Sequence, residues 1–571
     1  MADRERGNVS KRTGSASRAL VEALVAADVS HAFTVPGESF LGVLGGLRDE
    51  PGIRVMATRH ESGASFMAEA YGKITHRPAV CLATRTVGAT NMAIGVHTAM
   101  QDSTPLVAVL GQVPTKWRHR EAFQESNLAE VFGPTVKWAI EVNDASRLGE
   151  LAYRAARLAV DGRPGPVVLI LPEDILEEQV DLVFRPPVVP ARCLPDPRDV
   201  AAAIALLRAA ERPAILVGAG ILAAGATDLA VELAEREEVP VFTSWRRPDA
   251  FPNDHRLYLG QTGLSSPPSV AERLRAADAL LVLGCRLDEN TTFGYSVPTS
   301  ATRWAHVDLV PHGLSGDRAA ELTSRSGPAE FLKSALQLAA AEIPADRVSA
   351  NESDRDRWCS QSTPRRGSAR AGFADQQAIA GHLRRMLPQD AVVVSDAGNF
   401  SGWGARYLRW NRPGTFLGPI SGAMGYAVPA AVGAKLADPT RPVVALAGDG
   451  GFLMTASEIE TAVREHVPFV SIVFDNRQYG TIRMHQEARL DGDLVATGLG
   501  PVDFAGLTAA LGGQGFSVDD ADDFPDVFAA AMNCGMPTTI AVRVDSEQLS
   551  VGSDSSTDVS DRVVPAVGDC R

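Results

Sequence analysis

The chain has 571 residues, of which 45% are hydrophobic and 22% charged, and its formal net charge is −14. This composition is typical of a folded globular protein, and the acidic balance excludes a broad basic face for nucleic acid. At about 150 residues per domain the length predicts three or four domains, and we take three. The sequence has no secretory signal pattern and no uninterrupted apolar run of about 18 residues, so no membrane contact is expected. Its six cysteines form no C-x-x-C pair, which predicts reduced thiols and a cytoplasmic protein.

The first informative stretch is TRHESGASFMAEAYG, residues 58–72, where one carboxylate, Glu61, stands between a strand-like run and a helix of small and apolar residues. A helix start favours negative charge, because free backbone N–H groups and the helix dipole stabilise it there. On this stretch alone Glu61 is therefore either a helix cap or a functional acid.

Short apolar runs alternate with helix-like stretches from about residue 30 onward, for example AVCLAT (79–84) and PVVLILP (166–172). The same rhythm restarts after a proline-rich stretch at 185–199 and again after a polar, charged stretch at 345–370. Continuous apolar strands between helices predict parallel sheets covered on both faces. The expected fold is α/β, with three doubly wound domains. The expected segments are a tail (1–14), an N-terminal domain (15–184), a linker (185–199), a central domain (200–344), a linker (345–370), a C-terminal domain (371–548) and a tail (549–571).

The strongest local motif is Gly448-Asp449-Gly450, which follows the apolar run VVALA. The glycines allow a sharp turn at the carboxyl edge of a sheet, where ligands bind in open α/β folds. A second apolar run ends in Asp475-Asn476, with 24 residues between Gly450 and Asp475. A carboxylate and an amide oxygen at one edge suit Mg²⁺. The tripeptide alone is better explained as a plain turn, with Asn476 as a helix cap, and it is the spacing of the two runs that favours the metal.

This spacing resembles that of the thiamine-diphosphate enzymes, and the resemblance extends from about residue 15 to residue 548. It is greatest to proteins of the acetolactate synthase type. It rests on separate stretches in the same order: VPGES (35–39), RHESGASFMAEAYG (59–72), VGATN (87–91), DSTPLVAVLGQVP (102–114), EAFQE (121–125), GAMGYAVPAAVGA (422–434) and the metal motif.

The resemblance implies that Asp449, Asn476 and the backbone carbonyl of Gln478 hold Mg²⁺, which binds the diphosphate of thiamine diphosphate. Met424 would support the bent cofactor, or would otherwise be a core residue that forms an apolar wall. The other positions that the resemblance assigns to the cofactor site are Gly448, Gly450, Gly451, Gly398, Asn399, Glu38 and Pro36.

For Glu61 the resemblance implies a hydrogen bond to the cofactor's pyrimidine nitrogen, through a shared proton that favours the imino tautomer and so activates the thiazolium carbon. This role needs a carboxyl group in a dry pocket. In relatives the two halves of a site come from different subunits. A homodimer or homotetramer with sites at subunit interfaces is therefore implied.

The resemblance also implies the reaction. Gln124 corresponds to the residue that faces the reacting centre in acetolactate-type carboligases, and Phe123 would line the pocket; the alternative for both is a surface loop. Simple pyruvate decarboxylases use adjacent histidines as proton donors, and none of the 11 histidines here adjoins another. The expected function is decarboxylation of a small 2-oxo acid, such as pyruvate, and joining of the enamine to a second carbonyl compound. The alternatives are a specialised 2-oxo acid decarboxylase or aldehyde lyase, and a catalytically inactive cofactor-binding homologue.

Two positions depart from the acetolactate synthase pattern. Thr86 stands where those enzymes have the first glycine of GPGATN, so a β-branched side chain is expected beside the thiazolium and favours small donors. His485 stands where they have a tryptophan that helps to select the second substrate, and it either faces the pocket or is a solvated loop residue.

The central domain carries the least information. The stretch LVGAGILAAG (216–225) fits a dinucleotide-binding turn only loosely, because no acidic residue follows at the expected place. Relatives that hold FAD do so in this domain, partly through an arginine that corresponds to Arg286 in GCRLDEN. FAD is therefore a further cofactor that the resemblance allows.

Overall fold

The computed structural model describes residues 12–365, 367, 369–490 and 493–551. Residues 1–11 and 552–571 of the two expected tails (1–14 and 549–571), and Cys570 with them, lie outside the described residues. The chain separates into two compact units, Met1–Pro190 and Ala191–Arg571, which we describe one at a time. The three predicted domains are each built on a parallel six-stranded sheet, which confirms the expected α/β class.

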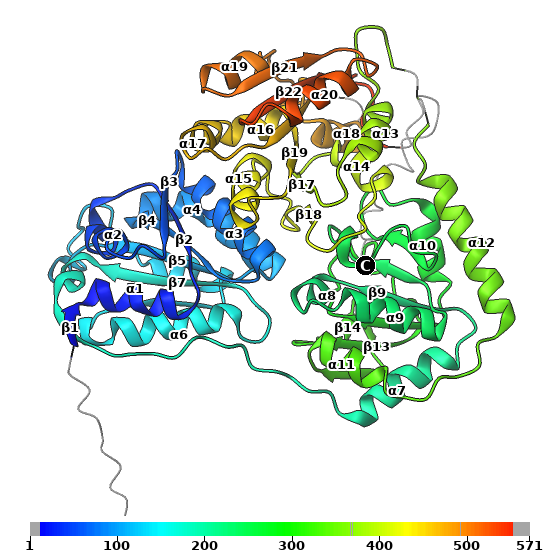
Figure 1. Cartoon of the computed structure of the whole chain (residues 1–571), viewed down its shortest axis with the longest axis horizontal. Coiled ribbons are helices and arrows are strands. Elements are labelled where there is room, and N and C mark those ends of the chain that lie inside the picture. The colour runs from blue at the N-terminus through cyan, green and yellow to red at the C-terminus, as the bar shows by residue number, and fades with distance from the viewer. Residues whose placement is uncertain (1–11, 366, 368, 491–492, 552–571) are drawn as a thin grey trace, which may run out of the picture. The chain divides into compact units, whose positions relative to one another are not determined.

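The first unit contains a parallel sheet with the strand order β3-β2-β4-β5-β7-β6 (Figure 1). The helices α1, α2 and α6 share one apolar core with one face of this sheet, and α3 and α4 pack together on the other. Small residues permit the close packing of α3 against α4, since a Cβ on Gly95 of α4 would lie 2.1 Å from the Ser65 Oγ of α3. The strands are β1 (Arg12–Ser15), β2 (His31–Thr34), β3 (Arg54–Ala57), β4 (Ala79–Thr84), β5 (Leu106–Gln112), β6 (Trp138–Glu141), β7 (Pro166–Pro172) and β8 (Gln179–Leu182). The helices are α1 (Ala16–Ala26), α2 (Leu41–Arg48), α3 (Glu61–Thr75), α4 (Arg85–Asp102), α5 (Leu128–Phe132) and α6 (Leu148–Val160).

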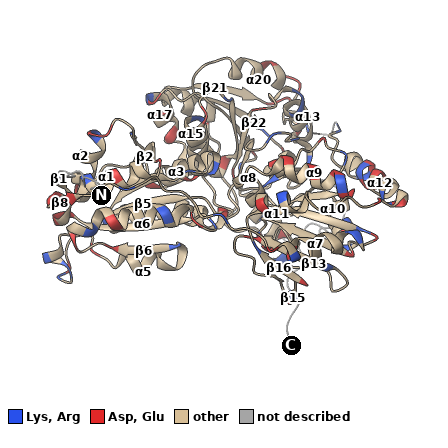
Figure 2. Ribbon diagram, turned by 60° about the horizontal axis from the view of Figure 1, so that its bottom comes forward, with Lys and Arg blue, Asp and Glu red and all other residues tan. Residues whose placement is uncertain are grey.

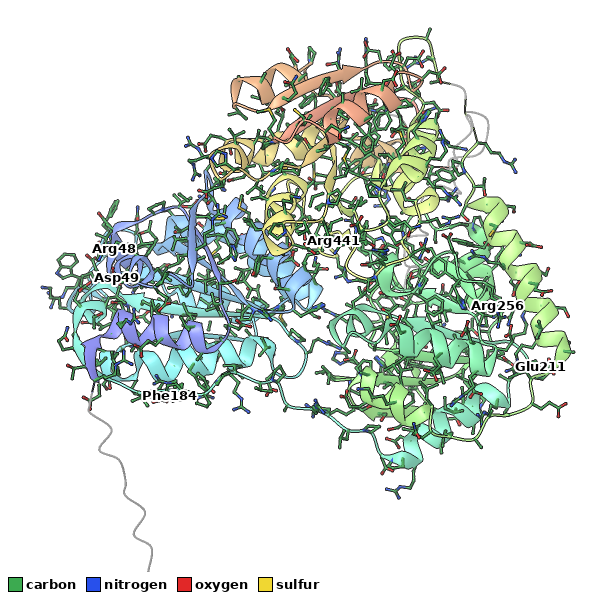
Figure 3. All side chains as sticks on the ribbon, viewed as in Figure 1. Arg48, Asp49, Phe184, Glu211, Arg256 and Arg441 are labelled. Carbon is green, nitrogen blue, oxygen red and sulfur yellow. The ribbon has the colours of Figure 1, made fainter. Side chains whose placement is uncertain are left out.

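Two ends of this unit differ in detail from the expected segments. Arg12, Thr13 and Gly14, expected in a tail, form β1 and pair antiparallel with β8. After β8 the chain runs without helix or strand to Asp196, and Phe184 on this stretch is 87% exposed (Figure 3).

The second unit begins with a sheet of order β11-β10-β9-β12-β13-β16. Numbered within the domain this order is 3-2-1-4-5-6, which is the order of dinucleotide-binding folds. The strands are β9 (Pro213–Val217), β10 (Val241–Thr243), β11 (Tyr258–Gln261), β12 (Ala279–Leu283), β13 (Arg303–Asp308), β14 (Leu314–Ser315), β15 (Arg318–Ala319) and β16 (Leu322–Arg325). The helices are α7 (Pro197–Arg208), α8 (Ala219–Ala223), α9 (Thr227–Glu237), α10 (Pro268–Arg275) and α11 (Pro328–Ala335).

The prediction of a linker at 345–370 is wrong for most of its length, because α12 (Ala345–Gln361) is a helix that packs on α10 and β11. Its charged residues, interspersed in sign in Figure 2, are used in ion pairs such as Arg273 Nε to Asp354 Oδ2 at 2.7 Å. Trp358 anchors the helix, with Arg355 and Arg409 stacked at 4.5 and 4.3 Å from its ring. Such cation–π contacts let a polar sequence form a packed helix.

The C-terminal sheet has the order β18-β17-β19-β20-β22-β21, again parallel. Numbered within each domain, this order and that of the first unit are both 2-1-3-4-6-5. The strands are β17 (Val392–Ser395), β18 (Phe416–Leu417), β19 (Val443–Gly448), β20 (Val470–Asp475), β21 (Gln514–Val518) and β22 (Thr538–Arg543). The helices are α13 (Gln376–Met386), α14 (Ser401–Tyr407), α15 (Ala427–Ala437), α16 (Asp449–Thr455), α17 (Glu458–Arg464), α18 (Gly480–Arg489), α19 (Phe504–Ala510) and α20 (Phe524–Met532).

The strand orders place a reversal of direction between β2 and β4, between β9 and β12, and between β17 and β19. Loops at the carboxyl ends of strands diverge at such a point and leave a crevice in which ligands bind. Within the described part of the chain, no helix is both long and apolar enough to cross a membrane.

Candidate active site

The reversal point of the C-terminal sheet opens into a cavity of about 240 Å³. The loop after β17, the start of α16 after β19 and the loop after β20 all contribute to its wall. The predicted residues Gly398, Asn399, Met424, Gly448, Asp449, Gly450, Gly451, Asn476 and Gln478 line it together. The sequence motifs that lie far apart in the chain therefore meet at one edge of one sheet.

Asp449 is the central charged group of this cavity and is 5% exposed. Its Oδ1 accepts a hydrogen bond from Gly450 N at 2.9 Å, while its Oδ2 is buried without a partner among the described residues. Burial raises the pKa of Asp449 to about 7; the bond from Gly450 opposes this shift and the nearby Asp475 carboxylate adds to it. An unpaired carboxylate oxygen in a buried site is costly, and a bound cation removes the cost.

Asn476 and Gln478 supply neutral oxygens beside Asp449. Asn476 Oδ1 accepts from Gln478 N at 3.1 Å, and the Gln478 carbonyl accepts from Gly480 N at 2.9 Å, so each oxygen keeps a second lone pair. The described residues contain no group of three or more His, Cys, Asp and Glu side chains that could hold a metal. A donor set of carboxylate, amide and carbonyl oxygens fits a hard cation such as Mg²⁺ better than zinc.

The glycines of the motif keep the cavity open. A Cβ on Gly450 would lie 2.6 Å from the Tyr479 ring, and one on Gly451 would lie 3.0 Å from Asp396 Oδ2. Gly398 has φ of +152°, a conformation essentially restricted to glycine.

Asp396 is a functional residue that the sequence reasoning missed. It follows β17, is 1% exposed, and its Oδ2 accepts from Gly425 N at 3.1 Å and Ala427 N at 3.4 Å. Burial raises the pKa of Asp396 to about 6. The carboxylate holds the turn that carries Met424 against the cavity. Its place directly after an apolar strand, in SDAGN, is the signal that could have identified it.

Asn399 is more constrained than expected. Its Nδ2 donates to Leu549 O at 2.6 Å, and its Oδ1 accepts from Thr481 Oγ1 at 3.0 Å. The segment after β22 thus lies along the cavity, where Gln478 Nε2 also donates to Ser546 O at 2.7 Å. Leu549 and Val551, expected in a tail, are buried.

In the first unit, Glu61 is the first residue of α3, but it is not the cap of that helix. His60 is the N-cap, and its Nδ1 accepts from Ser62 N at 3.2 Å. Glu61 Oε2 accepts instead from Asn91 Nδ2 on α4 at 3.0 Å. Gly88 makes room for this carboxylate, because a Cβ there would lie 3.0 Å from Glu61 Oε1. The geometry therefore favours a functional acid over a structural cap.

The reversal point of the same sheet brings Thr86 to the loop that carries Phe123 and Gln124. The Thr86 hydroxyl donates to the Gln124 carbonyl at 2.8 Å. Phe123 is 72% exposed, and the side-chain amide of Gln124 has no hydrogen-bond partner among the described residues. Glu38 Oε1 lies 3.5 Å from Arg85 Nη2, and Pro36 is exposed near it in sequence.

Two further predicted residues of the second unit are outside the lining of its 240 Å³ cavity. His485, half-buried on α18, is not among the residues that line the 240 Å³ cavity, and its Nδ1 is buried without a partner among the described residues. Arg286 follows β12 and is half-buried beside the reversal point of the central sheet, where Gly220 N donates to Gly284 O at 2.8 Å.

Comparison with known proteins agrees with this geometry. Residues 14–131 match the family described as "Thiamine pyrophosphate enzyme, N-terminal TPP binding domain", residues 200–335 match its central domain, and residues 396–542 match its C-terminal TPP binding domain.

Relatives that match over nearly the whole chain include the following three. The acetolactate synthase large subunit of Parasynechococcus marenigrum is 31% identical, covering 93% of this chain and 88% of the relative. The acetolactate synthase of Mycobacterium bovis is 30% identical with the same coverage of both chains. The sulfoacetaldehyde acetyltransferase of Alcaligenes xylosoxydans xylosoxydans is 29% identical, covering 91% of this chain and 90% of the relative.

The raised pKa of Asp449 predicts pH-dependent metal binding, because Mg²⁺ and a proton compete for the same carboxylate. Mg²⁺-dependent binding of thiamine diphosphate, measured by calorimetry, should weaken by roughly tenfold for each pH unit well below pH 7. Asp449→Ala should abolish this binding while leaving the circular dichroism spectrum unchanged, and Asp526→Ala, at an exposed position of the same domain, should behave as wild type. Wild-type affinity in Asp449→Ala would show that the metal is held elsewhere.

Proposed function

The chain belongs to the thiamine pyrophosphate enzymes, and from that premise we propose that it is a Mg²⁺-dependent carboligase of the acetolactate synthase type. It decarboxylates a small 2-oxo acid, such as pyruvate, and joins the remaining fragment to a second carbonyl compound. Family membership by itself makes the protein a thiamine-diphosphate-dependent enzyme. Beyond family membership we propose the identity of the metal, the class of substrates and the oligomeric assembly.

The cavity in the C-terminal domain fits the diphosphate and its metal. Mg²⁺ would be held by Asp449, Asn476 and the Gln478 carbonyl. It would pair with the Oδ2 of Asp449, which is buried and has no partner among the described residues. Met424 would support the cofactor rings from its turn, held in place by Asp396.

Glu61 would hold a proton at the pyrimidine nitrogen, with Asn91 fixing the orientation of its carboxylate. Bound thiamine diphosphate supplies an acidic thiazolium carbon, on which a 2-oxo acid loses CO₂. The protein contributes orientation, charge and exclusion of water, as is usual when a cofactor carries the difficult step.

The observation that carries carboligation is the unpartnered amide of Gln124. An amide N–H is far too weak an acid to protonate a reaction centre, but it can hydrogen-bond the oxygen of a second carbonyl compound. Phe123 beside it offers an apolar wall. A decarboxylase that releases free aldehyde needs a proton donor at this place instead.

The relatives are named for different products: acetolactate synthases on one side, a sulfoacetaldehyde acetyltransferase on the other. The second substrate is therefore what an assay of this protein must identify. We also propose a homodimer or homotetramer with sites at subunit interfaces. Exposed apolar residues along α4 support this assembly, since Val87 is 50% and Ile94 is 39% exposed.

FAD is a further proposed cofactor. Within the second unit a cavity of about 230 Å³ is lined by the rings of Trp245, Trp410 and Phe416 and by Gln261. Gln261 is 6% exposed, and its Oε1 is buried without a partner among the described residues. The planar isoalloxazine ring, which has one N–H donor, fits both the aromatic wall and this acceptor. Arg286 is not among the residues that line this cavity, so a role for it would concern another part of FAD.

The proposed function predicts carbon–carbon bond formation. Purified enzyme with thiamine diphosphate and Mg²⁺ should release CO₂ from pyruvate, and adding a panel of 2-oxo acids and aldehydes should yield a ligated product detected by mass spectrometry. Release of CO₂ with free aldehyde as the sole product would make the protein a decarboxylase. No CO₂ from any 2-oxo acid would make it an inactive homologue.

Glu61→Gln should bind thiamine diphosphate but fail to activate it, because glutamine keeps the shape and loses the shared proton. Deuterium exchange at the thiazolium carbon, followed by NMR, should slow by roughly 10²- to 10⁴-fold. His60→Ala removes the true N-cap of α3 and serves as the control for a merely structural effect. Exchange at the wild-type rate in Glu61→Gln would refute the assigned role.

The FAD proposal predicts that purified protein takes up flavin, visible as absorbance near 450 nm after desalting, as for flavoproteins generally. Gln261→Leu removes the buried acceptor at similar size and should weaken uptake by roughly tenfold or more, since a polar ring atom is then left unpaired. Gln337→Leu, at an exposed position in the same unit, should bind as wild type. A wild-type preparation that takes up no flavin would disprove this part of the proposal.

A further inference from the structure

The loop from Arg118 to Ser126 has an unusual backbone. Three non-glycine residues in it adopt positive φ: His119 at 62°, Glu121 at 54° and Gln124 at 62°. Conformations of this kind cost free energy and persist only where surrounding contacts fix them, often at functional sites. The contacts that fix this loop therefore indicate what it is for.

The first half of the loop is organised by its own side chains. Glu125 Oε1 accepts from His119 N at 2.7 Å, and Glu125 Oε2 accepts from Ala122 N at 3.2 Å. Arg118 Nη1 pairs with the same carboxylate at 2.8 Å and reaches Glu141 through Nη2 at 2.9 Å. None of these contacts involves the carbonyl of Phe123 or Gln124.

The second half of the loop is held from outside, by the first two residues of α4 and by Gln112 of β5, whose Nε2 donates to the Ser126 carbonyl at 3.0 Å. Thr86 Oγ1 lies 2.8 Å from the Gln124 carbonyl oxygen and 2.6 Å from Ser126 Oγ. The threonine hydroxyl therefore donates to the carbonyl, and the serine hydroxyl donates to the threonine oxygen. Arg85 Nη1 donates to the Phe123 carbonyl at 3.1 Å, and the guanidinium lies 6.0 Å from the Phe123 ring.

These bonds determine how Gln124 is presented. With its carbonyl bound to Thr86, the backbone keeps the left-handed conformation, and its side-chain amide is left without a partner among the described residues. A glycine at position 86, the residue type of the GPGATN pattern, has no hydroxyl and keeps only the longer contact of the backbone N–H with the Gln124 carbonyl, which is 3.5 Å in this chain. The side chain that was expected to narrow the room beside the thiazolium thus has its hydroxyl directed to the loop.

We propose that Thr86 is a positioning residue, which acts through Gln124 to select the second carbonyl substrate. This inference rests on the proposed function, because it gives Gln124 a substrate to recognise. Thr86 holds the backbone of residues 123–126 in one conformation, and it is Gln124, not Thr86, that contacts the substrate. Loss of the Thr86 hydroxyl leaves the loop to sample other conformations in which the amide points elsewhere.

The first test is independent of catalysis and uses hydrogen exchange with mass spectrometry on the full chain without cofactor. Thr86→Val keeps the shape and removes the hydroxyl; Thr86→Ser keeps the hydroxyl. Exchange in the peptide that contains the amides of Ala122 and Glu125 should be roughly 3- to 10-fold faster in Thr86→Val, the effect of one lost hydrogen bond. It should be unchanged in Thr86→Ser.

The matched control is Thr90→Val, one turn further along α4, whose hydroxyl bonds, among the described residues, to carbonyls of its own helix. Peptides from the buried strand β5 report whether a variant is globally destabilised and should exchange alike in all proteins. Equal exchange of the loop peptide in wild type and Thr86→Val would show that the Thr86 hydroxyl does not hold the loop.

The second test concerns substrate choice in the loaded enzyme. Thr86→Val should raise KM for the second carbonyl substrate by roughly 3- to 10-fold, as expected for one misplaced hydrogen bond, and Thr86→Ser should restore it. If exchange of the loop peptide changes but the KM for the second carbonyl substrate does not, Thr86 has no role in selecting that substrate. Absence of any 2-oxo acid turnover in wild type would instead overturn the proposed function, and with it the role of Thr86 in substrate selection. The exchange experiment would still decide whether the Thr86 hydroxyl holds the loop.

Discussion

The unpartnered carboxylate oxygen of Asp449 is the constraint around which the C-terminal domain is arranged. A buried negative oxygen with no donor is unfavourable by several kcal/mol unless a cation or a proton satisfies it. The pKa of about 7 means that, without a cation, the site is poised between these two solutions near neutral pH. The surrounding glycines, the Met424 turn and the segment after β22 form the walls of the cavity in which we propose that a metal and a diphosphate bind.

The sheet topology explains why the motifs of the candidate site are so far apart in the sequence. The first and last domains share one strand order, and each places its candidate site residues where that order reverses. In the first domain Arg85 and Thr86 lie at the reversal point, and Glu61 follows β3, the strand next to β2. In the last domain Asp396 and Asp449 lie at the reversal point. Parallel strands put all their carboxyl ends at one edge, so residues that follow different strands converge without being near in sequence.

Much of this could be predicted from the sequence, because continuous apolar strands and strand-end glycines are local signals. The three α/β domains and the convergence of the metal motif follow from them. Helix α12 could not be found in that way: its polar sequence resembles a linker, and its stability comes from ion pairs and from Trp358 held between two arginines, which are long-range contacts. The same holds for Asp396, whose role depends on backbone N–H groups that lie about 30 residues further along the chain.

Glu61 and Thr86 show how contacts decide between chemical roles that a sequence leaves open. Position at a helix start made Glu61 a candidate cap, but the cap is His60, and Asn91 holds the carboxylate of Glu61 toward α4. A β-branched residue in place of glycine suggested only bulk at position 86. In the structure the Thr86 side chain also makes a contact, because its hydroxyl donates to the Gln124 carbonyl at 2.8 Å. A departure from a family pattern can therefore add an interaction as well as remove space, and the loop with three left-handed residues is where this chain uses it.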